Sequence, residues 1–173
     1  MMKIIALLFI FAFFQFSNGN PSGDDRIVNG EDAKLGQFPH QVLWASDSYG
    51  SVFCGGSIYS KSTIVTAAHC CKAVDNGFAQ LEDMRIIAGR VDINDMVNGE
   101  EISIKSYTIH PDYIGNSEQH NDVCLLTLDD DLEFNDNVKA IGLNTANLTA
   151  GTECTVSGWG TLKVNASFDS HIG

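Results

Sequence analysis

The stretch SVFCGGSIYSKSTIVTAAHCC, residues 51–71, gives the clearest indication of the fold. Two runs rich in β-branched and aromatic residues, at 51–60 and 62–69, lie on either side of Lys61. Short runs of the same kind, separated by turn residues, recur at 41–46, 85–89, 102–109, 122–128 and 153–160. No segment keeps a helical period, although 67–74 has room for one or two helical turns. Many short strands with turns between them predict an all-β sandwich or barrel.

The end of this stretch, TAAHCC, sets His69 among small residues and beside Cys70 and Cys71. Three roles are open to such a histidine: a general base, a zinc ligand, or a structural residue next to a disulfide. An unperturbed pKa near 6.5 suits a general base. A zinc site usually combines two ligand pairs at short spacing. Since these two cysteines have no second pair nearby, the pattern argues against zinc.

Residues 1–19 have the pattern of a secretory signal peptide. The basic start MMK precedes an apolar run at 4–16, and small residues at 17–19 suit a signal peptidase. The run is shorter than the roughly 20 residues that span a bilayer. The alternative is a buried N-terminal strand, which would be unusually long for a strand without a turn. We therefore expect a secreted, extracellular chain that is not held in a membrane, in an oxidising compartment where cysteines pair.

Composition excludes some partners. The 173 residues suit one domain, or one domain and part of another, and a hydrophobic content of 44% is enough for a packed core. The net charge of −12 repels phosphate, so we expect no nucleic-acid partner.

The polar segment 20–26 has the pattern of an activation peptide. It contains proline and glycine and ends at Arg26, ahead of the apolar pair Ile27 and Val28. Cleavage after Arg26 by an activating trypsin-like protease would create a new amino terminus on Ile27. That ammonium can be buried if it meets a carboxylate, which would make a switch. The alternative is a plain strand start, because Arg-Ile-Val is a common sequence.

Five short motifs identify a family resemblance: RIVNG at 26–30, CGGSIYS at 54–60, TAAHCC at 66–71, HNDVCLL at 120–126 and VSGWGTL at 156–162. In this order they make residues 27–162 resemble the trypsin-like (chymotrypsin-fold) serine endopeptidases. The resemblance implies two six-stranded antiparallel β-barrels with an active site between them. It implies a first barrel at 27–132, a connection at 133–150 and the start of a second barrel at 151–173.

The same resemblance implies the roles of two residues. His69 corresponds to the general base and Asp122 to the carboxylate that orients it, in a mechanism that needs no cofactor and acts on proteins or peptides. A structural role for Asp122, as a cap at the start of a strand, is the alternative. The chemistry agrees, because a serine hydroxyl needs a neighbouring base and that base needs a fixed tautomer.

The resemblance also implies a disulfide between Cys54 and Cys70. The family partner of Cys154 lies far downstream, so we expect Cys154 to be unpaired in this chain.

Two further cysteines depart from the commonest family pattern, because Cys71 closely follows His69 and Cys124 closely follows Asp122. If the histidine and the aspartate touch, these neighbours must also lie close together. We therefore predict a Cys71–Cys124 disulfide that braces the pair; two buried free thiols are the alternative.

The family's nucleophile lies in a GDSGGP motif that does not occur in these residues. Ser57 and Ser170 both lack the flanking residues of that motif. We therefore expect an incomplete chain with a truncated second barrel, inactive by itself. Two alternatives remain: a non-catalytic protease homologue, or a short secreted variant that acts as a binding or regulatory protein.

The sequence also bears on glycosylation and on calcium binding. Asn147 and Asn165 begin sequons for N-glycosylation. Residues 89–101 fall where many family members carry a calcium loop, and Arg90 stands where a ligating glutamate is common. A fixed cation opposes a second one, so we predict no tightly held calcium and no other metal.

Overall fold

The structure is a computed structural model, and it describes residues 31–46, 51–95, 97–115 and 119–160. The predicted signal peptide, the activation segment with Arg26 and Ile27, and the sequon at Asn165 lie outside these residues.

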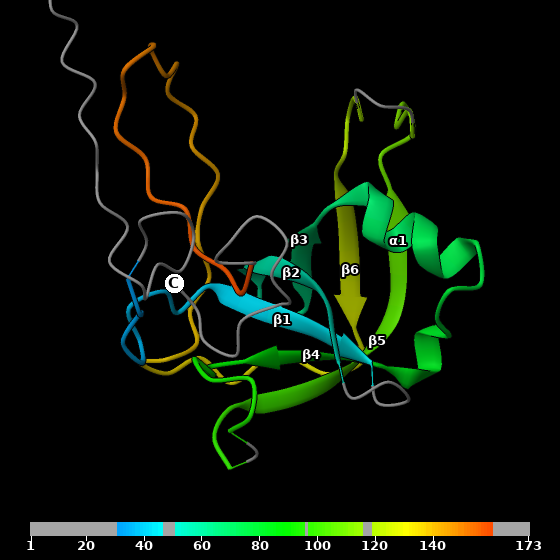
Figure 1. Cartoon of the computed structure of the whole chain (residues 1–173), viewed down its shortest axis with the longest axis horizontal. Helices are drawn as coiled ribbons and strands as arrows, with labels where there is room; N and C mark the ends of the chain where they lie inside the picture. Colours follow the sequence, from blue (N-terminus) through cyan, green and yellow to red (C-terminus); the bar gives the residue numbers. More distant parts are fainter. Residues whose placement is uncertain (1–30, 47–50, 96, 116–118, 161–173) are drawn as a thin grey trace, which may run out of the picture.

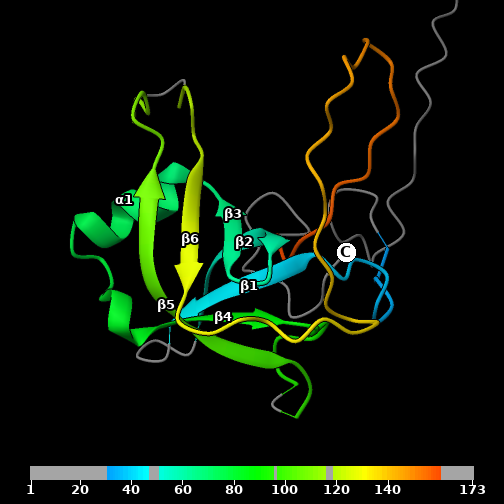
Figure 2. The same cartoon turned by 180° about the vertical axis from the view of Figure 1, so that it is seen from behind.

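Six strands dominate the described part of the chain, together with one α-helix and a short 3-10 helix. In chain order the elements are β1 (Gln41–Ser46), β2 (Ser51–Ser60), β3 (Thr63–Thr66), α1 (Ala68–Asp75), η1 (Leu81–Asp83), β4 (Met84–Ala88), β5 (Glu100–Ile109) and β6 (Cys124–Leu128). The strands close into one antiparallel barrel in the order β1-β2-β3-β6-β5-β4 (Figures 1 and 2). The all-β prediction is confirmed.

Alternation along the strands builds the core of the barrel. In β6, the side chains of Cys124, Leu126 and Leu128 are buried, while Leu125 and Thr127 between them are exposed. This period of two places every second residue inside. The largest fully buried side chains include Trp44, Leu43, Ile58, Ile64, Met84, Ile86 and Leu126. Each contributes about 1.5–3 kcal/mol relative to an exposed position.

The glycine pair at the start of the CGGSIYS motif has a packing reason at its second position. A Cβ atom on Gly56 would lie 2.7 Å from Cγ2 of Ile64 and 3.1 Å from the carbonyl oxygen of Val65. Strands β2 and β3 approach too closely here for any larger residue. The close approach keeps β3, and the residues that follow it, tight against the barrel.

Two of the expected strands differ from the structure. The run at 62–69 divides into β3 and the start of α1, which are separated by Ala67. Residues 153–160, expected to form a strand, have no regular secondary structure. A strand needs a neighbour for its backbone hydrogen bonds, and no described strand pairs with this segment.

Part of this segment nevertheless packs on the outside of the barrel. Trp159 is 4% exposed, lies in a cluster with Ala33, Leu43 and Ile87, and donates from its indole Nε1 to the carbonyl of Val91 at 2.8 Å. The segment that leads to it, coloured orange, stands away from the barrel in both views (Figures 1 and 2). Among the helices that the structure describes, none combines the length and apolar character needed to cross a membrane.

Candidate active site

The barrel brings His69 and Asp122 together although 53 positions separate them. Strands β3 and β6 are neighbours, and Thr66 pairs with Cys124 in their ladder. His69 follows shortly after the end of β3, in the first turn of α1, and Asp122 comes just before β6. Both residues therefore emerge at the same end of the same strand pair.

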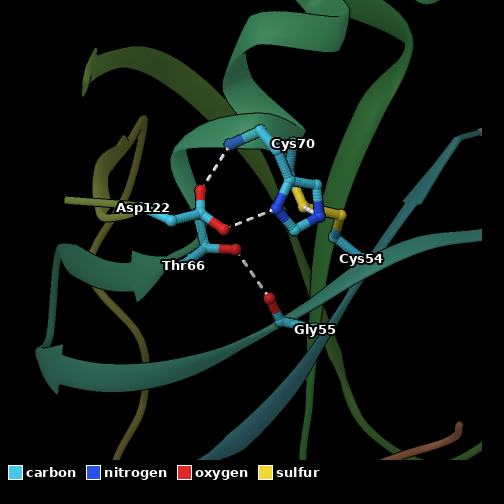
Figure 3. A network of polar contacts seen from close by, with 6 residues as sticks. Cys54, Gly55, Thr66, Cys70 and Asp122 are labelled. Carbon is cyan, nitrogen blue, oxygen red and sulfur yellow. Dashed lines mark hydrogen bonds and ion pairs between the residues drawn. A yellow bond between two sulfur atoms is a disulfide. The ribbon is translucent and has the colours of Figure 1, made fainter. Parts of the chain in front are cut away.

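The carboxylate of Asp122 binds His69 at two points. The ring Nδ1 of His69 lies 2.8 Å from Oδ2, and the backbone N–H of His69 donates to Oδ1 at 2.8 Å. The backbone of Ala68 also donates to this carboxylate. Figure 3 shows Asp122 turned toward the start of the helix.

Asp122 also completes the N-terminus of α1. The N-cap residue, Ala67, has no side chain that can accept a hydrogen bond from the first turn. The first backbone N–H groups of a helix need partners from outside the helix, and a carboxylate there is favourable. Asp122 supplies that partner from a distant part of the chain.

These contacts determine the charge state of Asp122. Partial burial alone would raise the pKa of its carboxyl, but hydrogen bonds from the ring and backbone of His69 outweigh that effect. The pKa of Asp122 is therefore held below its usual value, and the group is an anion at neutral pH.

The anion fixes the tautomer of the histidine. A carboxylate can accept hydrogen bonds but cannot donate them, so Nδ1 of His69 carries the proton and Nε2 is left with its lone pair. The side chain of His69 is 51% exposed, and a hollow of about 350 Å³ beside it is lined by residues that include Phe53, Gly55 and Ser157. Nε2 lies 3.3 Å from Sγ of Cys70, and His69 as a residue lines the hollow.

The other end of α1 is anchored as well. Asp75 accepts a hydrogen bond from the hydroxyl of Tyr107 on β5, and Lys72 forms an ion pair with it at 2.9 Å. The hydrogen bond to Asp75, with burial and the negative charge, raises the pKa of Tyr107 to about 12.

Two disulfides lie beside the pair. One joins Cys54 to Cys70 (Figure 3), and the other joins Cys71 to Cys124. Cys71 and Cys124 are fully buried. Cys154 is exposed and forms no disulfide with any described residue.

The ligand atoms of Cys54, His69 and Cys70 lie within 4.8 Å of one another, which resembles a zinc site. Both sulfurs belong to one disulfide, so neither is a thiolate. A disulfide-bonded sulfur is not the ligand that zinc binds.

The segment 89–101 contains Arg90, the residue whose positive charge is the reason for predicting no bound calcium here. Arg90 is buried, and its guanidinium donates from Nε to the carbonyl of Asn98 at 2.9 Å and from an Nη to Glu101 at 3.0 Å.

A family model described as Trypsin matches residues 27–171. The chain belongs to the trypsin family.

Relatives support this trypsin-family assignment. The chain is 37% identical to hypodermin-A of Hypoderma lineatum over 166 residues, which cover 92% of this chain and 60% of that protein. It is 37% identical to trypsin delta of Drosophila melanogaster over 147 residues, which cover 85% of this chain and 54% of that protein. It is 35% identical to trypsin of Sus scrofa over 146 residues, which cover 83% of this chain and 57% of that protein. This trypsin-family chain thus spans little more than half the length of these curated relatives.

Solved structures agree with the fold. Human heparin binding protein superposes with a TM-score of 0.71 at 27% identity, over 84% of this chain and 62% of that one. Neuropsin, a serine protease expressed in the limbic system of mouse brain, gives a TM-score of 0.72 at 23% identity, over 84% of this chain and 61% of that one. The predicted chymotrypsin-like fold is confirmed.

Sequence reasoning missed two residues of this trypsin-family site. Thr66 donates from its hydroxyl to the carbonyl of Gly55 at 2.7 Å, which ties the end of β3 to β2 (Figure 3). Asn121 adopts a left-handed backbone with φ of 56° directly before Asp122. A left-handed asparagine next to a functional residue has no distinctive pattern in a single sequence. The predicted glycosylation residue Asn147 is exposed.

Proposed function

We propose that this chain is the amino-terminal part of a secreted trypsin-like serine endopeptidase, in which His69 is the general base and Asp122 orients it. The double hydrogen bond between these residues, 2.8 Å at the ring and 2.8 Å at the backbone, carries the proposal. Membership of the trypsin family supports it.

The geometry supports one chemical role for each residue. Nε2 of His69 accepts the proton of an attacking hydroxyl and later returns it to the leaving amine. Asp122 keeps the proton on Nδ1, and its negative charge stabilises the imidazolium that forms. The hydroxyl and the donors that stabilise the oxyanion belong to motifs that do not occur in these 173 residues. We therefore propose that the 173-residue chain alone hydrolyses no peptide bond.

The proposal includes a zymogen. Residues 1–19 direct secretion, 20–26 form the activation peptide, and a trypsin-like protease cuts between Arg26 and Ile27. Protein or peptide substrates then bind the mature enzyme. In this scheme 27–132 form the first barrel, 133–150 the connection and 151–173 the start of the second barrel. The closed barrel between Gln41 and Leu128 is consistent with that division.

A second candidate is a non-catalytic homologue that binds partners through the same fold. Two observations weigh against it. The His69–Asp122 pair is intact, and the net charge of −12 opposes binding of a polyanion such as the heparin for which the human structural neighbour is named. A short secreted variant with a regulatory role is a related alternative.

Two experiments test the proposed function. After secretion and exposure to trypsin, N-terminal sequencing should read Ile-Val-Asn-Gly from Ile27. A start at Met1, or no cleavage after Arg26, would contradict the zymogen. A reagent specific for active-site serines, applied to the cut 173-residue chain, should leave it unlabelled. Stoichiometric labelling would show that the chain already holds its nucleophile.

A further inference from the structure

We propose that Asn121 is a positioning residue for Asp122: its left-handed backbone and its side-chain bond to Asp112 hold the carboxylate against the start of α1. This inference deepens the proposed function, because the position of Asp122 matters to catalysis only if Asp122 orients His69.

Asp122 lies at the centre of a tight three-residue turn. The backbone N–H of Val123 donates to the carbonyl of Asn121 at 2.7 Å, so the turn closes across Asp122 itself. The direction of the Asp122 side chain is therefore set by the backbone of its two neighbours. Asn121, the residue that leads into this turn, has a positive φ of 56°. Asparagine reaches this conformation more readily than other residues with a Cβ atom.

The turn is fastened on both sides to one segment, residues 110–112, which follows β5. After Asp122, the carbonyl of Val123 accepts a hydrogen bond from the backbone N–H of His110 at 2.9 Å. Before it, Nδ2 of Asn121 donates to the carbonyl of Asp112 at 2.9 Å. Asp112 is itself held, because its backbone N–H donates to Nδ1 of His110 at 3.1 Å. Removal of the Asn121 bond leaves the side before Asp122 held by the backbone N–H of Ile114, which donates to the carbonyl of His120 at 3.1 Å, one residue further from the carboxylate.

The side chain of Asn121 is bonded to the backbone of Asp112 rather than to His69, so its effect on the histidine must pass through Asp122. Its two contributions can be separated by substitution. Asn121→Gly keeps access to the positive φ but loses the side-chain donor. Asn121→Ala loses both. Asn135→Ala is the control: it removes an Nδ2 donor to a backbone carbonyl, that of Glu133 at 3.2 Å, and also the Oδ1 acceptor of the Asn137 N–H at 2.8 Å.

The experiment compares these variants of the disulfide-bonded chain by NMR. The first readout is hydrogen exchange of the His69 backbone N–H, which donates directly to Asp122. A hydrogen bond of ordinary strength predicts exchange about threefold faster in Asn121→Gly, and the added backbone cost predicts about tenfold faster in Asn121→Ala. The second readout is the pKa of Asp122, which should rise toward its ordinary value in the same order. Asn135→Ala should change neither.

If Asn121 served only to close the loop, both readouts would keep their wild-type values in all variants. That result would overturn the proposal. Equal acceleration of the amide of Asn76, which belongs to the far end of α1, would also overturn it by indicating general loosening. Both readouts are independent of turnover, so they separate a failure of this inference from a failure of the proposed catalytic function.

Discussion

Asp122 accepts two hydrogen bonds from His69, one from the ring Nδ1 and one from the backbone N–H, and both are 2.8 Å long. One carboxylate thus orients the imidazole and caps the helix that carries it. The relationship joins a catalytic proposal to the stability of the fold, so both can be tested with the same substitutions.

Asp122→Asn should reverse the tautomer of His69. An asparagine side chain has one accepting oxygen, and its NH₂ group cannot accept from Nδ1. If the oxygen stays with the backbone N–H of His69, the ring must move its proton to Nε2. ¹⁵N NMR of the ring should show Nδ1–H in the wild type and Nε2–H in the variant. We also expect the free energy of unfolding to fall by about 1–3 kcal/mol.

Asp131→Asn is a suitable control for that substitution, because Asp131 is exposed and far from α1 in the sequence. It removes the same charge and should leave the tautomer unchanged. An unaltered tautomer in Asp122→Asn would contradict the geometry of the pair.

Acid should weaken the fold through Asp122. Its pKa is lowered in the folded state, so the folded chain binds this proton less readily than the unfolded chain does. The resulting stabilisation is complete above the ordinary carboxyl pKa of about 3.9 and is lost as the pH falls through the lowered value. The difference in unfolding free energy between wild type and Asp122→Asn should therefore shrink below about pH 4. Denaturant titrations across that range would measure it, and a difference that stays constant would be contrary evidence.

The Cys71–Cys124 disulfide should stabilise the pair as well as the fold. The Cys71–Cys124 disulfide closes a separation of 53 residues, for which the chain-entropy model gives a stabilisation of about 4 kcal/mol. The Cys54–Cys70 disulfide closes a separation of 16 residues, for which the same model gives about 3 kcal/mol. Replacing Cys71 and Cys124 together by alanine should lower the free energy of unfolding and also speed exchange of the His69 backbone N–H.

Disulfide mapping of the non-reduced chain is the direct check on this bridge. A peptide that joins Cys71 to Cys124 is expected. A free thiol at Cys124 would show that the two cysteines are not bridged.

Calcium should not stabilise this chain. The guanidinium of Arg90, in the segment 89–101, is buried and is bound by Asn98 and Glu101. A second cation there would be repelled. The Tm should be the same with added calcium and with chelator. Arg90→Ala should lower the Tm, because it leaves the carbonyl of Asn98 without this donor. A rise in the wild-type Tm on adding calcium would contradict the prediction.

Much of the barrel could be predicted from the sequence because its strands are short, apolar and separated by turn residues. The expected runs at 41–46 and 51–60 coincide with β1 and β2. The run at 153–160 has the same composition but forms no strand, because a strand depends on a partner that composition does not reveal. The boundary between β3 and α1 also could not be predicted from the sequence, because Ala68 and its neighbours suit either a strand or a helix.

The candidate site was predictable through family motifs more than through spacing. His69 and Asp122 are 53 positions apart, and only the resemblance linked them before their distance was known. Asn121 could not be found in this way. Its role depends on a backbone angle and on a contact with Asp112, and neither is visible in one sequence.

The most direct test of the central claim is peptide hydrolysis by the product of the complete transcript that contains this sequence, cut after Arg26 and compared with its His69→Ala variant. We predict turnover that falls by about four orders of magnitude or more in the variant, as expected when a triad base is removed. Turnover that His69→Ala leaves unchanged, or a product without hydrolytic activity, would contradict the assignment of His69 as the general base of a peptidase.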